Sequence, residues 1–374
     1  MKQTLGHCMY VPNPQTIEPE FTIEVDSFTQ TIFAPTNSTF AFVKGTRHAQ
    51  KKIEIFREFQ KINEFEGTSS SSWSFSFNSE FLLSKGGNSV QFWSLDGGVI
   101  QSIEFPASNA PYEVQSYFAR DGSFIYLGPQ TEKEPSRFVV AVWLPGTPMD
   151  RLGRFEFASD IQDFAKCEAG TSAAIFQTGH NEHTFLYEAD GHGGESQHSL
   201  INVIGGDIAL TQLPGIFIYS ICSSPTNTQL TLLEPHPNTI RCVSLPKFDN
   251  VSEALQMPLS KEAEDWDYDF LSQCDYISDT MVAVSTEYGR LFIVTTKTMQ
   301  VLGEIETKGF ELRPHHKDNP NLQLSSRLSD IRRCQEKYLL ARYGAFSPLG
   351  QEPTQHTLAF LSIDTITKTM TKQP

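Results

Sequence analysis

The chain contains 374 residues, 39% of them hydrophobic and 20% charged, and these proportions exclude an intrinsically disordered chain and a membrane-embedded one. Its 29 Lys and Arg residues against 44 Asp and Glu residues give a formal net charge of −15 at pH 7. A protein that grips nucleic acid needs a cationic surface to displace phosphate counterions, so direct nucleic-acid binding is not expected. An acidic surface of this kind favours solubility and attracts basic partners over long range.

We expect a cytoplasmic protein without a signal peptide or a membrane span. The first eight residues contain no apolar run of the kind that a signal peptide needs. The longest uncharged stretch, residues 208–233, is interrupted by Pro214, Gly215 and Pro225, which excludes a spanning helix. The six cysteines are scattered without a CxxC pair, as expected of buried thiols in a reducing compartment.

In chain order, the first ambiguous element covers residues 50–65. Ile53, Phe56 and Phe59 are spaced by three, as on a helix, but the stretch begins with an apolar–polar alternation and its surroundings are rich in β-formers. We therefore predict strands here. The remaining sequence is a succession of short runs of Val, Ile, Phe, Tyr and Thr separated by turn-forming residues, which predicts an all-β protein.

The clearest repeating unit spans residues 73–98. It reads as an inner strand, a tight turn, an apolar strand, a second turn and a strand that ends in Trp93 and Ser94. This unit resembles a blade of a WD-repeat propeller, with Trp93-Ser94 where the Trp-Asp dipeptide usually stands. Further copies begin near Tyr117 and Cys274.

The spacing of the copies predicts a propeller. With weaker copies included, the units are anchored near residues 33, 76, 118, 165, 211, 273 and 333, and four of the six intervals lie between 42 and 47 residues. We expect residues 1–374 to form a single β-propeller of seven four-stranded antiparallel blades. A pair of large β-sandwiches is the alternative fold, although sandwiches do not require equal spacing.

A propeller removes its open sheet edge by combining strands from both ends of the chain in one blade. The amino-terminal candidates are residues 8–11 and 21–25, and the carboxyl-terminal candidates are residues 338–342 and 357–363. We expect closure by pairing of these strands.

Few residues are candidates for catalysis or metal binding. His180 and His183 belong to the densest group of imidazoles, but residues three apart on a strand face opposite sides, so the two meet only in a turn. A zinc site needs three or four preset ligands, and solvated loop histidines are the favoured interpretation. No nucleophile elbow, phosphate-binding loop or dinucleotide fingerprint occurs. We expect no catalytic residue, no metal and no cofactor.

Two connections exceed the repeat period, near residues 247–268 and 306–326. Residues 261–269 contain five carboxylates and two aromatic side chains, and residues 308–317 are basic. If the WD-repeat plan holds, both connect an outer strand to the next inner strand and are neighbours. Aromatic side chains among carboxylates suit a basic, partly apolar protein partner. The predicted partner-binding residues are Asp265, Trp266, Asp267, Tyr268, Arg313, His315 and His316. The alternative is that the two loops pair with each other.

These features predict a non-catalytic scaffold for protein–protein interaction, or a subunit of a larger assembly. The alternative is a propeller enzyme, or a binder of a small ligand or metal, that uses the central channel.

Overall fold

The computed structural model describes part of the chain. Between residues 103 and 217 it describes only the backbone of strands. The described residues are 14–26, 28–34, 38–46, 49–70, 72–76, 79–86, 89–104, 115–118, 124–131, 134–143, 173–178, 181–190, 196–204, 207–212, 218–226, 228–234, 238–245, 251–257, 259, 269–287, 289–310, 326–334, 336–345 and 355–372. The chain divides into two compact units, one formed by Met1–Ser27 with Phe217–Pro374 and the other by Phe28–Ile216.

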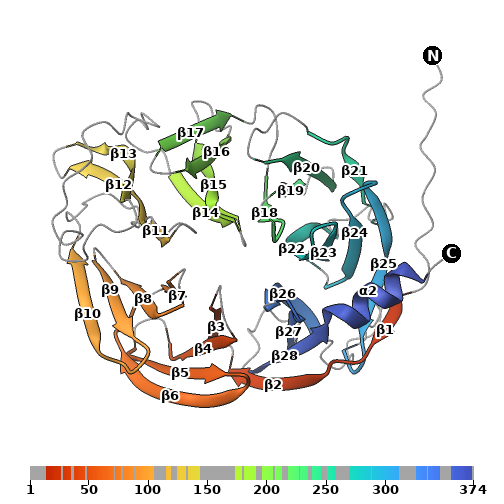
Figure 1. Cartoon of the computed structure of the whole chain (residues 1–374), viewed down its shortest axis with the longest axis horizontal. Coiled ribbons are helices and arrows are strands. Elements are labelled where there is room, and N and C mark those ends of the chain that lie inside the picture. Colours follow the sequence, from red (N-terminus) through yellow and green to blue (C-terminus); the bar gives the residue numbers. More distant parts are fainter. Residues whose placement is uncertain are drawn as a thin grey trace, which may run out of the picture. The chain divides into compact units, whose positions relative to one another are not determined.

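In the described part of the Phe28–Ile216 unit, every strand belongs to an antiparallel sheet whose strands follow chain order (Figure 1). The first sheet contains β3 (Gln30–Phe33), β4 (Thr39–Lys44), β5 (Lys51–Arg57) and β6 (Gln60–Gly67). The second contains β7 (Ser72–Phe75), β8 (Phe81–Gly86), β9 (Ser89–Ser94) and β10 (Val99–Glu104). The third contains β11 (Gln115–Phe118), β12 (Phe124–Thr131) and β13 (Glu134–Trp143). The fourth contains β14 (Ala173–Thr178), β15 (Asn181–Asp190), β16 (Ser196–Ile204) and β17 (Asp207–Gln212).

The ambiguous residues 50–65 form strands, as predicted. Ile53 and Ile55 of β5 are fully buried, because alternate residues of the strand face the core that its sheet shares with the next sheet. Trp93 is 6% exposed in this core and donates a hydrogen bond from Nε1 to Ser84 Oγ at 2.9 Å. The tryptophan that carries the resemblance to a propeller blade is therefore a structural core residue.

The described strands of the other unit also form antiparallel sheets in chain order, with two additions from the amino-terminal end. One sheet contains β18 (Ser220–Ser223), β19 (Gln229–Glu234), β20 (Thr239–Ser244) and β21 (Leu255–Gln256). The next contains β22 (Leu271–Ser278), β23 (Met281–Thr286), β24 (Leu291–Thr295) and β25 (Gln300–Thr307), with β1 (Gln15–Ile17) beside β25. The last contains β26 (Ser326–Cys334), β27 (Tyr338–Ala345) and β28 (Gln355–Ser362), with β2 (Phe21–Asp26) beside β28.

Strand β2 joins the carboxyl-terminal strands. It pairs antiparallel with β28 over six residue pairs, and Phe21 stacks on Phe360 with ring centroids 4.4 Å apart. Tyr338 of β27 donates a hydrogen bond from its hydroxyl to Glu20 at 2.9 Å. The other amino-terminal candidate, residues 8–11, lies outside the described residues.

Strand β1 was not predicted. It pairs parallel with β25, and its Ile17 is 2% exposed within the hydrophobic core of the unit. A strand of three residues is too short to show a periodic pattern in the sequence. It is recognised only from its pairing with β25.

The helix α2 (Ile363–Thr371) was also not predicted, because residues 357–363 were expected to be one strand. The strand ends at Ser362, whose side chain accepts a hydrogen bond from the backbone N–H of Thr365 and caps the helix. Ile363, Ile366 and Met370 are buried on one helix face. In the described parts of the chain, no helix has the length and hydrophobicity needed to cross a membrane.

The repeat anchors 273 and 333 lie in β22 and β26, each the first of the consecutive strands in its sheet, but the anchor at residue 211 does not fit. Thr211, an anchor for the start of a blade, lies in β17, and the next described strand begins at Ser220. Residue 165, another anchor, lies outside the described residues.

Candidate functional site

The predicted partner-binding residues Asp265, Trp266, Asp267, Tyr268, Arg313, His315 and His316 lie outside the described residues, and so does His180. His183 lies in β15, of which only the backbone is described. The candidate site is therefore built from the described residues that flank the two charged segments. We name residues 261–268 the acidic segment and residues 311–317 the basic segment.

Asn238 holds the chain on both sides of the acidic segment. Its backbone carbonyl accepts a hydrogen bond from Met257 N at 3.0 Å. Its side-chain amide donates to the carbonyl of Asp269 at 3.0 Å, and its Oδ1 accepts from Leu271 N at 3.1 Å. Asn238 has a φ of 67°, a left-handed conformation that Asn tolerates better than most residues. One residue in the turn before β20 thus fixes the base of the acidic segment.

Arg290, a described cation that interacts electrostatically with Asp269 at this base, is already paired. Arg290 binds Glu304 through two hydrogen bonds of 2.8 and 2.7 Å and lies 4.6 Å from the centroid of the Phe292 ring. Burial lowers the pKa of Arg290, but the bonds to Glu304 and the charge of Asp269 outweigh burial, and the pKa is raised. The Arg290 guanidinium therefore keeps its positive charge and is already paired with Glu304.

The described residue that precedes the basic segment is fixed as well. Phe310 stacks on Tyr343 with ring centroids 4.4 Å apart, and its backbone N–H donates to the carbonyl of Thr307 at 2.9 Å. The hydroxyls of Tyr343 and Thr307 lie 2.6 Å apart in a buried hydrogen bond. Because β27 supplies Tyr343, the end of β25 is held against the following sheet.

The acidic segment leads into β22 and the basic segment leads toward β26, and these two strands are neighbours. Two side chains of β22 accept hydrogen bonds from the backbone of β26. Gln273 Oε1 accepts from Ile331 N at 3.0 Å, and Asp275 Oδ2 accepts from Arg333 N at 2.6 Å. The strands that follow the two charged segments are thus joined directly.

A group of charged side chains surrounds this junction. Burial raises the pKa of Asp330, although the charges of Arg332 and Arg342 act in the opposite direction and the charge of Asp275 adds to the rise. Burial lowers the pKa of Arg342, while Asp330 raises it. Arg332 Nε donates to Asp330 Oδ2 at 3.2 Å. The arrangement places opposite charges side by side at the strand junction and contains no nucleophilic side chain.

The four described cysteines, Cys222, Cys242, Cys274 and Cys334, are buried free thiols. Burial raises the pKa of Cys242 to about 11 and that of Cys334 to about 12. The thiolate is the nucleophile and the metal ligand, so both roles are disfavoured at these two positions. Within the residues that the structure describes, no group of three or more His, Cys, Asp or Glu side chains is placed to hold a metal ion.

Comparison with solved structures supports the fold. The β-propeller domain of Cps50 (Swd1) from Myceliophteria thermophila matches with a TM-score of 0.51 and 14% sequence identity over 92% of this chain and 100% of that domain. The chain is similar in fold to a β-propeller. This likeness confirms the propeller resemblance inferred from the repeats, and at 14% identity it concerns the fold alone. No protein-family model matches the sequence, and the search of curated proteins finds no match.

Sequence reasoning did not find the residues that anchor the charged segments. Asn238 follows Pro235 and Pro237, and such a cluster predicts a turn but not the residues that it binds. Gln273 and Asp275 lie two apart on one strand, so they share a face, which is the one signal that could have indicated their common role.

Proposed function

We propose that this protein is a non-catalytic scaffold for protein–protein interaction, built as a single seven-bladed propeller that β2 closes by pairing with β28. The acidic segment forms the main contact with a basic, partly apolar partner protein, and the basic segment flanks that contact. We place the protein in the cytoplasm, where a reducing environment keeps its buried thiols free.

The observation that supports this function best is the fixed base of the acidic segment. Asn238 binds Met257 on one side and Asp269 and Leu271 on the other. A segment whose ends are held loses less conformational entropy when it binds than one with free ends. Loops on a rigid scaffold are also the usual carriers of binding function.

Charge and side-chain type indicate the partner's chemistry. The acidic segment combines Trp266 and Tyr268 with four carboxylates in a chain of net charge −15. Buried Trp and Tyr contribute most of the binding energy at interfaces, and surrounding charges mainly set the association rate. A partner with a basic surface and an apolar pocket would attract the carboxylates and bury the two aromatic rings.

Site-specific photo-crosslinking tests this function. A benzophenone amino acid replaces Trp266 in one variant and Tyr219, which is 56% exposed, in a control variant of the same unit. We expect the first variant to crosslink a basic protein from native lysate and the control to give no such product. A chain that elutes alone at 42.0 kDa, or equal crosslinking from both positions, contradicts the proposal.

A further inference from the structure

The helix α2 carries a polar stripe opposite its buried face. The buried residues Ile363, Ile366 and Met370 join the core of their unit, and the helix contacts β1, β25 and β28. The stripe is defined by Thr365, Lys368, Thr369 and Lys372, whose spacing places them on one helix face. Because the opposite face is anchored in the core, the stripe is held in a fixed position.

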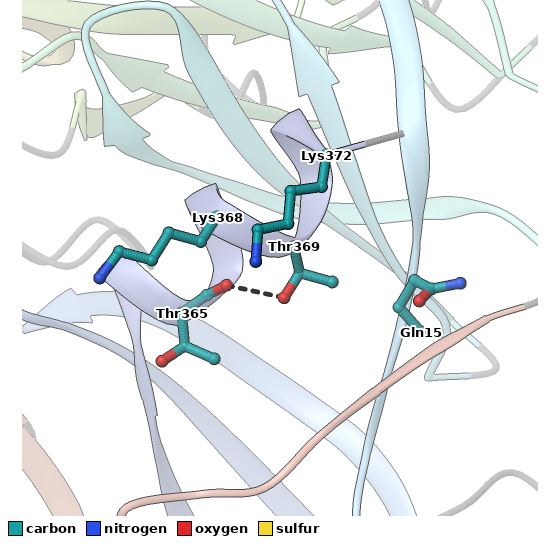
Figure 2. A pocket seen from close by; sticks show the side chains of 5 residues that line it. All are labelled: Gln15, Thr365, Lys368, Thr369 and Lys372. Atoms are coloured by element: carbon teal, nitrogen blue, oxygen red, sulfur yellow. Dashed lines mark hydrogen bonds between the residues drawn. The ribbon is translucent and has the colours of Figure 1, made fainter. Parts of the chain in front are cut away.

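The stripe and Gln15 of β1 line an open pocket of about 490 Å³. Figure 2 shows both lysine side chains extending from the same helix and Gln15 on the facing strand. Thr369 donates a hydrogen bond from its hydroxyl to the carbonyl of Thr365 at 2.8 Å, which orients its side chain. The pocket is thus walled by two cations, two hydroxyls and an amide.

The two lysines differ from several other described lysines, which are paired with carboxylates. Lys44, Lys61 and Lys308 each lie 2.6–3.1 Å from a carboxylate oxygen. Lys368 and Lys372 form no ion pair with any described residue. The helix dipole favours cations near its carboxyl end, but it does not require them to line a pocket. Although the chain has a net charge of −15, these two lysines form a local positive site that can bind an anionic group.

We propose that this pocket binds an extended acidic segment of a partner protein, with carboxylates at alternate positions. Four residues of helix rise separate Lys368 from Lys372, which is about 6 Å. Alternate side chains of an extended strand lie on one side and about 6.6 Å apart, so two such carboxylates match the spacing of the two lysine positions along the helix. The Thr365 hydroxyl can donate to or accept from the peptide groups between these carboxylates, and the Thr369 hydroxyl, which already donates to the Thr365 carbonyl, can accept. The partner's charge is opposite to that expected at the acidic segment, so this surface is separate from the proposed function.

Fluorescence anisotropy with the full chain tests the proposal. The probe is a labelled octapeptide of alternating Glu and Ser, measured at low ionic strength, and the control probe has Gln in place of Glu. We expect only the Glu–Ser peptide to bind, with an affinity that falls as salt rises. The double variant Lys368→Ala, Lys372→Ala should weaken binding about tenfold, the effect of losing two exposed ion pairs.

Matched variants separate the pocket from general charge. The double variant Lys297→Ala, Lys337→Ala removes the same charge at two other exposed positions and should bind as the wild type does. Lys368→Arg with Lys372→Arg should retain binding. The proposal is overturned if the Glu–Ser peptide does not bind, if the two alanine pairs weaken it equally, or if inorganic phosphate or an RNA oligonucleotide displaces it at lower concentration.

Discussion

Asn238 holds the chain on both sides of the acidic segment. Its side chain binds Asp269 and Leu271, and its backbone binds Met257, so three hydrogen bonds hold the chain around the acidic segment. Its φ of 67° is accessible to Asn and Gly but costs other residues about 1–2 kcal/mol.

Replacement of Asn238 separates the hydrogen bonds from the backbone conformation. Asn238→Gly keeps the φ but leaves the buried N–H of Leu271 without its acceptor, and should reduce the free energy of unfolding by about 1–3 kcal/mol. Asn238→Ala should cost about 1–2 kcal/mol more, because Ala is strained at this φ. Urea denaturation measures both values, and hydrogen exchange at Leu271 should accelerate in both variants. Equal stability of Gly and Ala variants would show that backbone strain is absent.

Asp330 should make stability depend on pH. Its pKa is raised, chiefly by burial, so the folded state holds the carboxyl proton more tightly than the unfolded state does. The contribution of Asp330 to stability is therefore greatest below its ordinary pKa and falls as pH rises through the raised pKa. Asp330→Asn removes this titration, so the variant should gain stability relative to wild type between pH 4 and pH 7. Chemical denaturation at both values measures the difference, and a change in the opposite direction would mean that Arg332 and Arg342 lower the pKa overall.

At the scale of elements, β2 connects the two ends of the chain. Deletion of residues 1–26 removes β1 and β2 and exposes the surfaces covered by Ile17 and Val25. Burial of these two side chains alone contributes roughly 3–6 kcal/mol, so the melting temperature of the remaining chain should fall sharply. Glu24→Gln, a change at an exposed position of the same strand, is the matched control and should have little effect. Unchanged melting of the truncated chain would show that β2 does not close the domain.

The elements differ in how far the sequence predicts them. The unit at residues 73–98 was identified because its strands, turns and Trp93 are local features, and β7, β8 and β9 follow that pattern. The strand β1 depends on pairing with β25, nearly 300 residues away, and the nine-residue α2 spans few helical turns. Neither element has enough local periodicity for the sequence to indicate it.

The candidate site was predicted by composition rather than by contacts. The acidic segment was recognisable from its carboxylates, Trp266 and Tyr268, because an unusual composition is visible in one sequence. Its anchor at Asn238 lies more than 20 residues earlier, and the junction of Gln273 and Asp275 with β26 forms only when the strands pack side by side. Contacts of this kind follow from the fold and not from local spacing.

As proposed above, the whole molecule is a propeller scaffold that presents the acidic segment to a partner protein. The measurement that tests it most directly is made on Trp266→Ala, with partner affinity and melting temperature determined on the same preparation. We expect the affinity to fall by about 2 kcal/mol or more while the melting temperature stays close to that of the wild type. The variant Asp265→Asn with Asp267→Asn should mainly slow association and weaken its salt dependence. A large loss of melting temperature with unchanged affinity per folded molecule would contradict the claim and make Trp266 a part of the scaffold.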